Sequence, residues 1–70
     1  MLQGTIKWFN YDKGYGFIIP DEKKAEKDVF VHITALQRAN IEHLDEGQRV
    51  VYETYSDRGR IAADILQVLS

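Results

Sequence analysis

The sequence predicts an all-β fold in which five short strands close into a small antiparallel barrel. Five segments are rich in β-branched and aromatic residues and are separated by turn signals. With 70 residues, the chain is expected to form a single domain that buries only about 60% of its unfolded surface. It contains no cysteine for a disulfide or a zinc thiolate site. Closing a sheet on itself is one remaining way to build a compact core.

The first three strands are expected in the N-terminal half of the chain. Strict alternation breaks within the first strand, which indicates a β-bulge near Trp8. Residues 11–14 carry a turn signal, and Pro20 should stop the second strand because it cannot donate a ladder hydrogen bond. The charged residues 21–27 are typical of a solvated loop. The expected strands are Leu2–Asn10, Tyr15–Ile19 and Val29–His32.

Two further strands are expected after one helical turn and a long connection. A turn signal at residues 57–59 separates these two strands. The expected elements are a helical turn at Thr34–Gln37 and strands at Arg49–Tyr55 and Ile61–Leu69. By alternation, the residues expected to share one face are Val50, Tyr52 and Thr54 in the fourth strand, and those expected to point inward in the fifth are Ile61, Ala63 and Ile65.

The net charge argues mildly against a nucleic-acid partner, whereas the charge distribution allows one. The net charge is −2, and proteins that bind nucleic acid are usually basic. Lys7 and Lys13 lie among aromatic residues, and Asp12 is the only acidic residue before Asp21. Most other acidic residues gather in expected loops. A local basic face is therefore compatible with an acidic chain, with weaker non-specific affinity for phosphate than a basic protein has.

No segment of the sequence indicates export or a membrane span. The N-terminal residues lack the basic and apolar regions of a signal peptide. No apolar run approaches the roughly 20 residues needed to cross a bilayer. The lack of cysteine fits a reducing compartment. We therefore expect a cytoplasmic protein with no membrane partner.

Strand alternation predicts a cluster of outward-facing rings. If Ile18, Val29 and Val31 point into the core, their neighbours point outward. These neighbours are Tyr15, Phe17, Phe30 and His32, joined by Trp8 through the bulge. A small domain rarely exposes so many rings without a use. Stacking of nucleobases is such a use and is worth about 1–3 kcal/mol per base. Gly14 and Gly16 would let a flat base approach closely.

The opposite register stays open on the pattern alone. Aromatic residues of small β-domains usually lie in the core, as we expect for Phe9. If Phe17 and Phe30 lay there too, Ile18 and the two valines of the third strand would face water. A slip of one residue exposes either set.

Four motifs, in order along the chain, resemble the bacterial cold-shock proteins. They are Gly4-Thr5-Ile6-Lys7-Trp8-Phe9-Asn10, Lys13-Gly14-Tyr15-Gly16-Phe17-Ile18, Asp28-Val29-Phe30-Val31-His32 and Leu44-Asp45-Glu46-Gly47-Gln48. The second and third resemble the two RNA-binding motifs of that family. The resemblance implies one cold-shock domain over residues 1–70, a five-stranded barrel of the oligonucleotide/oligosaccharide-binding type. It also implies binding of single-stranded RNA and DNA, RNA chaperoning that keeps transcripts unpaired, and an effect on transcription termination.

The resemblance further implies which residues contact nucleic acid. The expected stacking residues are Trp8, Tyr15, Phe17, Phe30 and His32, and the expected polar or charged contacts are Lys7, Asn10, Lys13, Asp28, Gln37 and Arg58. This sequence also departs from the family pattern. Ile33 and Ile41 stand where rings are usual, and the usual Arg-Gly-Pro turn is Arg58-Gly59-Arg60. Because each ring is worth about 1–3 kcal/mol, we expect a similar binding mode with a shorter or weaker series of subsites.

Other signals favour structural roles, and neither a cofactor, a metal ion nor an enzymatic activity is expected. Gly14-Tyr15-Gly16 lacks the third glycine and the helix of a dinucleotide-binding loop. His32 and His43 have no partner residues that would complete a metal site. Arg58 and Arg60 either solubilise their turn or contact phosphate.

A protein-interaction module is the alternative from another class. The aromatic face would then bind a peptide or a second copy of the chain. Exposed strand edges and Leu66 would support a dimer. The leading expectation is a monomer whose partners are single-stranded RNA and DNA.

Overall fold

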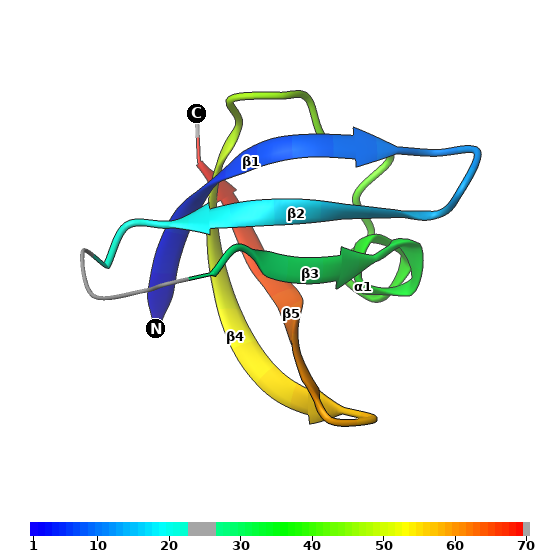
Figure 1. The fold of residues 1–70 in the computed structure, drawn as a ribbon. Helices are drawn as coiled ribbons and strands as arrows, with labels where there is room; N and C mark the ends of the chain where they lie inside the picture. Colours follow the sequence, from blue (N-terminus) through cyan, green and yellow to red (C-terminus); the bar gives the residue numbers. More distant parts are fainter. Residues whose placement is uncertain (23–26, 70) are drawn as a thin grey trace.

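The computed structural model describes residues 1–22 and 27–69 and shows five strands that close into a barrel (Figure 1). The elements are β1 (Leu2–Asn10), β2 (Tyr15–Pro20), β3 (Val29–His32), α1 (Ile33–Arg38), β4 (Arg49–Asp57) and β5 (Arg60–Leu69). Around the barrel the strand order is β1-β2-β3-β5-β4. The predicted five-stranded barrel is thus confirmed. Residues 23–26 of the expected charged loop lie outside the described residues.

The strand ends differ slightly from those predicted. Pro20 is the last residue of β2 and pairs with Gly4, rather than lying just beyond the strand. A proline is tolerated there because it stands at the end of the strand. The helical turn extends one residue further at each end than predicted. At its N-terminus the ring of His32 accepts a hydrogen bond from the backbone nitrogen of Thr34 at 3.2 Å, which caps the helix.

The pairing of β3 with β5 is parallel, whereas the sequence predicts antiparallel strands throughout. The chain leaves β3 through α1, crosses to β4 and returns along β5, so β5 runs in the same direction as β3. The two strands meet at Phe30 and Ala62. The pairings of β1 with β2, β2 with β3, β1 with β4 and β4 with β5 are antiparallel.

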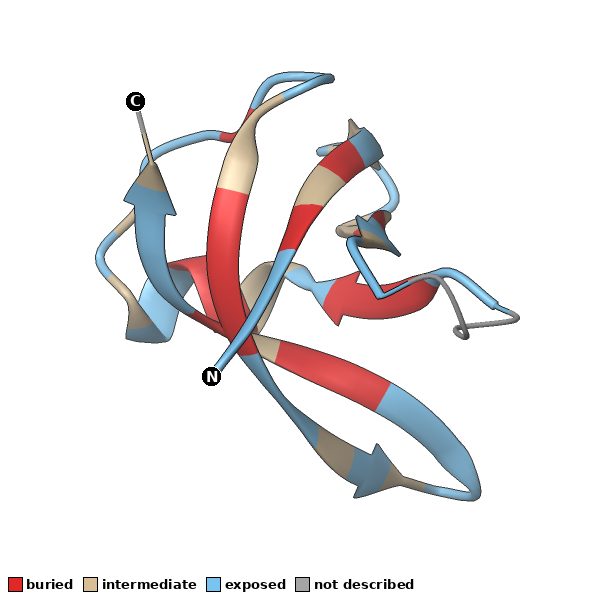
Figure 2. Ribbon diagram, turned by 90° about the vertical axis from the view of Figure 1, so that its left-hand side faces the viewer, coloured by how far each residue is buried: buried red, intermediate tan, exposed pale blue. Residues whose placement is uncertain are grey.

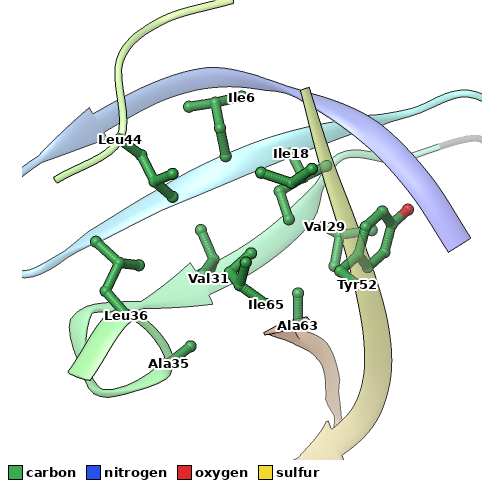
Figure 3. Packing of buried hydrophobic residues seen from close by; sticks show 11 residues of the cluster. Ile6, Ile18, Val29, Val31, Ala35, Leu36, Leu44, Tyr52, Ala63 and Ile65 are labelled. Atoms are coloured by element: carbon green, nitrogen blue, oxygen red, sulfur yellow. The ribbon is translucent and has the colours of Figure 1, made fainter. Parts of the chain in front are cut away.

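The core fills the interior of the barrel and extends to α1, and Figure 3 shows its side chains converging from every strand. Leu44, from the connection after α1, closes the same cluster. The cluster comprises Ile6, Ile18, Val29, Val31, Ala35, Leu36, Leu44, Val50, Tyr52, Ala63 and Ile65. Among the described residues the buried side chains are uncharged. The predicted inward direction of Ile18, Val29 and Val31 is confirmed, which leaves their neighbours on the outer face.

The hairpin formed by β4 and β5 reaches beyond the other strands, and this overturns two expectations. Ile61 is 55% exposed and Thr54 is also exposed, although both were expected on the face shared with core residues. Figures 1 and 2 show this part of the hairpin projecting from the barrel with a largely exposed surface. Alternation predicts burial only where the rest of the barrel covers one face of the strand. The end of the hairpin extends beyond the other strands, so the face that carries Thr54 and Ile61 is not covered there.

The predicted bulge in β1 is confirmed. The register with β2 shifts between Ile6, which pairs with Ile18, and Trp8, which pairs with Phe17. Ile6 is buried in the core, Trp8 is 36% exposed and Phe9 packs against the core cluster. The extra residue in β1 therefore turns Trp8 outward and Phe9 inward.

Gly16 allows β1 and β2 to approach at the bulge. It pairs with Phe9, and a Cβ atom at this position would lie against the carbonyl oxygen of Trp8 and 2.6 Å from Cδ2 of Phe9. No larger residue fits unless the backbone of β1 moves away.

The guanidinium of Arg49 links β4 to β1 and to the end of β2. Nη1 donates to Oγ1 of Thr5 at 2.9 Å and to Oδ1 of Asp21 at 2.6 Å. Nη2 donates to Oδ2 of Asp21 at 2.5 Å. Such a bidentate pair is geometrically specific. The hydrogen bonds from Arg49 lower the pKa of the Asp21 carboxyl below its usual value of 3.8.

Replacing Gly16 with alanine should destabilise the fold by about 1–3 kcal/mol, because the added methyl group overpacks a backbone contact. Urea denaturation followed by fluorescence measures the change. Gly59→Ala is the control, because a Cβ atom there meets nothing within 4 Å and only the positive φ of +85° is strained. Equal costs for the two variants would contradict the close-approach argument.

The variant Asp21→Asn should be less stable than the wild type at neutral pH, and the difference should vanish in acid. Because the folded-state pKa of Asp21 is lowered, its contribution is present above the unfolded value of 3.8 and is lost as pH falls through the folded pKa. Denaturation midpoints of both proteins from pH 7 to pH about 2 test this. A constant difference over that range would show that the charge of Asp21 is not responsible.

Candidate nucleic-acid interface

Rings from three neighbouring strands lie together on the outer face of the barrel. They are Trp8 of β1, Tyr15 and Phe17 of β2, and Phe30 and His32 of β3, and we call them the ring surface. In the strand register Trp8 pairs with Phe17, Phe17 with Phe30, and Tyr15 with His32. Directly opposed residues share one face of a sheet. The register therefore gathers the rings that alternation predicts.

The rings pack against one another. Trp8 meets Tyr15 and Phe17 edge-on, with centroids 5.7 and 5.2 Å apart. Tyr15 and Phe30 are stacked at 5.7 Å with their planes 27° apart, and His32 lies 6.3 Å from Phe30. Edge-on and offset arrangements of this kind are the favourable ones for aromatic pairs. The rings therefore support each other's positions without a ligand, which reduces the entropy lost on binding.

Exposure is unequal across the ring surface. Trp8 is 36% exposed, whereas Phe30 is only 8% exposed. Phe30 lies outside the core cluster, so its burial comes from other side chains on the outer face. Cζ of Arg60 lies 4.1 Å from the centroid of its ring. Phe30 was expected to point outward as a stacking platform, and on this outer face a guanidinium lies over its ring.

Three of the polar side chains predicted beside the rings, those of Lys7, Asp28 and Asn10, already have partners. Nζ of Lys7 forms an ion pair with Oδ2 of Asp28 at 2.9 Å, and both side chains are partly exposed. Oδ1 of Asn10 accepts a hydrogen bond from the backbone nitrogen of Lys13 at 3.0 Å, which closes the turn between β1 and β2. The ammonium group of Lys13 is carried on that exposed turn.

His32 has a local role besides its place among the rings. Its Nδ1 accepts from the backbone nitrogen of Thr34 and lies 3.0 Å from Oγ1 of the same residue. These two contacts fix the orientation of the imidazole at the end of β3. The ring is therefore held in position by the start of α1.

A hollow of about 310 Å³ lies between the ring surface and the β4–β5 hairpin. Its lining residues are Phe30, His32, Thr34, Tyr55, Asp57, Arg58 and Arg60. The structure thus brings Arg58, at the hairpin turn, close to the predicted rings. Gln37 lies exposed on α1 and is not among these lining residues.

Sequence reasoning missed Tyr55 and left Arg60 between two interpretations. A usable signal was present for Arg60, because it lies two residues before Ala62 and alternation gives the two the same face of β5. What the sequence did not contain was the pairing of Ala62 with Phe30, which brings that face beside the rings.

Within residues 1–22 and 27–69, no three His, Asp or Glu side chains are grouped so that they could hold a metal ion. His43 is exposed, with Nε2 3.5 Å from Oδ2 of Asp45. In the described part of the chain, no helix has both the length and the apolar character that crossing a membrane requires.

Comparison with known proteins gives consistent results over nearly the whole chain. The family model of the "cold-shock" DNA-binding domain matches residues 2–68. A probable cold shock protein of Sinorhizobium fredii is 52% identical over 69 residues, covering 96% of this chain and 97% of the relative. Cold shock protein 1 of Lactiplantibacillus plantarum is 49% identical over 67 residues, covering 94% of this chain and 97% of the relative. Cold shock protein CspA of Staphylococcus saprophyticus is 46% identical over 69 residues, covering 97% of this chain and 100% of the relative.

The family match spans all five strands of the barrel, and the barrel has the oligonucleotide-binding architecture expected from the resemblance. The chain therefore belongs to the cold-shock domain family, whose members are non-enzymatic proteins that bind nucleic acid.

Proposed function

We propose that this protein binds single-stranded RNA and DNA by stacking bases on the ring surface. The observation that carries the proposal is the cross-strand row of Trp8, Phe17 and Phe30, with neighbouring centroids 5.2 and 6.0 Å apart. Unpaired bases stack on such rings regardless of sequence, because every base has a π-face. A duplex hides these faces within its own stack, so the proposed ligand is single-stranded.

Cations around the ring surface supply the contacts to phosphate in this proposal. Lys13 and Arg58 are exposed on the turns at either side of the ring surface, and Lys7 lies on β1 beside Trp8. Lys7 also pairs with Asp28, so a phosphate would share or replace that contact. The net charge of −2 keeps the long-range attraction weak. Stacking therefore supplies most of the proposed affinity.

The proposed cellular role is that of an RNA chaperone. Bases that stack on the protein cannot pair with a complementary strand, so binding lowers the free energy of unpaired RNA relative to hairpins. The effect is passive and stoichiometric, because binding alone drives it. The same competition would weaken the hairpins of transcription terminators. We place this activity in a cytoplasmic monomer, as the sequence predicts.

Single-stranded heptathymidine should quench the fluorescence of Trp8, and the variant Phe17→Leu should bind it about tenfold more weakly, because one stacking platform is lost. The matched control is Leu66→Ser, which removes an exposed apolar side chain on β5 that is not part of the ring surface. This variant should bind as the wild type does. Titrations at two salt concentrations, with duplex DNA for comparison, measure these affinities.

Two outcomes would contradict the proposal. Equal affinity for duplex and single strands would exclude base stacking as the source of binding. If no oligonucleotide quenched Trp8 and the protein dimerised instead, with Leu66→Ser restoring the monomer, the alternative of a self-association module would be correct.

The variant Ile33→Phe should bind heptathymidine about tenfold more tightly, which corresponds to about 1.4 kcal/mol from one added platform. Ile33 is half-buried at the start of α1, and its backbone nitrogen donates to the carbonyl oxygen of Gly14 at 2.8 Å, beside the start of β2. The control is Ile41→Phe, because Ile41 packs against the core. That variant should lose stability without binding more tightly. No gain for Ile33→Phe would show that the ring surface does not extend onto α1.

A further inference from the structure

Arg60 covers the ring that lies furthest along the cross-strand row. Its Cζ atom lies 4.1 Å from the centroid of Phe30, well within the range of about 6 Å in which a cation is attracted to an aromatic face. Together with the neighbouring rings of Tyr15 and Phe17, this contact leaves Phe30 8% exposed, the least of the large side chains in that row. A base cannot lie flat on this face of Phe30 while the guanidinium occupies it.

The sheet fixes the position of Arg60. Phe30 pairs with Ala62 across the parallel contact of β3 and β5, and Arg60 lies two residues before Ala62 on the same face. Ala62 is fully buried and small, so its side chain leaves room on this face of β5 for the side chain of Arg60. At the hairpin end Arg60 pairs in register with Asp57. Backbone pairing on both sides of β5 therefore directs this side chain toward Phe30.

The charge of Arg60 is not used elsewhere in the described part of the chain. Lys7, Arg38 and Arg49 each form an ion pair with an aspartate. Within residues 1–22 and 27–69, Arg60 takes part in no ion pair and no side-chain hydrogen bond, although Asp57 is its neighbour in register. Its guanidinium lies on the ring of Phe30 and borders the polar hollow beside the hairpin.

We propose that Phe30 and Arg60 form a composite subsite in which a nucleobase stacks on the outer face of the guanidinium. This inference rests on the proposed function and deepens it. Guanidinium planes stack on bases as aromatic rings do, and they add a positive charge. Phe30 supports the guanidinium from below, so a base that binds there makes a sandwich of base, guanidinium and ring. The base edge then faces the hollow, where His32, Tyr55 and Arg58 offer polar atoms.

The alternative is that Arg60 acts as a cover that must leave before a base reaches Phe30. The two arrangements predict opposite changes in oligonucleotide affinity when Arg60 is removed. If Arg60 is part of the subsite, removing it weakens binding. If it is a cover, removing it exposes Phe30 and strengthens binding. A third arrangement, a contact with phosphate only, requires the charge of Arg60 but not its planar shape.

The test compares Arg60→Met, which keeps the length of the side chain, with Arg60→Lys, which keeps its charge. Heptathymidine affinity is measured by Trp8 fluorescence at one salt concentration. We expect Arg60→Met to bind about tenfold more weakly and Arg60→Lys to bind about threefold more weakly or worse. Arg49→Met is the matched control, because it makes the same change in net charge at an arginine of β4 that pairs with Asp21 and does not line the hollow. It should change affinity by less than about twofold.

A double-mutant cycle with Phe30→Leu tests the support that Phe30 gives. In that background the effect of Arg60→Met should fall from about tenfold to less than about threefold, because the guanidinium has lost its platform. Urea denaturation shows that each variant is folded. Tighter binding by Arg60→Met, wild-type affinity for Arg60→Lys, or an undiminished effect in the cycle would each overturn the inference. Failure of the wild type to bind any oligonucleotide would instead overturn the proposed function.

Discussion

The register shift in β1 opposite Gly16 is the constraint on which both the core and the ring surface depend. A strand with strict alternation places Ile6 and Trp8 on the same face, so either the core loses Ile6 or the outer face loses Trp8. The shift separates them, since Ile6 is buried and Trp8 is exposed, and it returns Phe9 to the core side. The bulge needs close approach of the two backbones, which the absent side chain of Gly16 permits. This one local irregularity therefore keeps Ile6 in the core and also places Trp8 on the outer face of the barrel.

Most of the fold followed from the sequence, because period-two patterns and turn residues act over short distances. The bounds of β1 and β3, the bulge and the inward direction of Val29 and Val31 all have local causes. The exposure of Ile61 and the position of Arg60 over Phe30 do not have local causes. The first depends on how far the hairpin projects beyond the barrel, and the second on the meeting of β3 and β5, which only the closed barrel defines.

The ion pairs of the surface explain how an acidic chain presents a face suited to nucleic acid. Lys7, Arg38 and Arg49 are each paired with an aspartate at the surface. Such exposed pairs contribute little to stability, commonly about 0–1 kcal/mol. They also neutralise cations that would otherwise attract phosphate. In the described part of the chain, Lys13, Arg58 and Arg60 stay outside these ion pairs, so the free positive charge lies beside the ring surface although the net charge is −2.

The two sides of the ring surface differ in the stacking groups that they carry. On the side of α1, Ile41 packs against the core and Ile33 carries no π-face, so the row of stacking groups ends at His32. On the side of the hairpin, Arg60 continues the row beyond Phe30 with a group that both stacks and carries charge. In the proposed binding mode, a strand of bases that follows the most continuous path would run from Trp8 through Phe17 and Phe30 toward the hairpin. The bound segment is thus expected to be displaced away from the helix and onto β5.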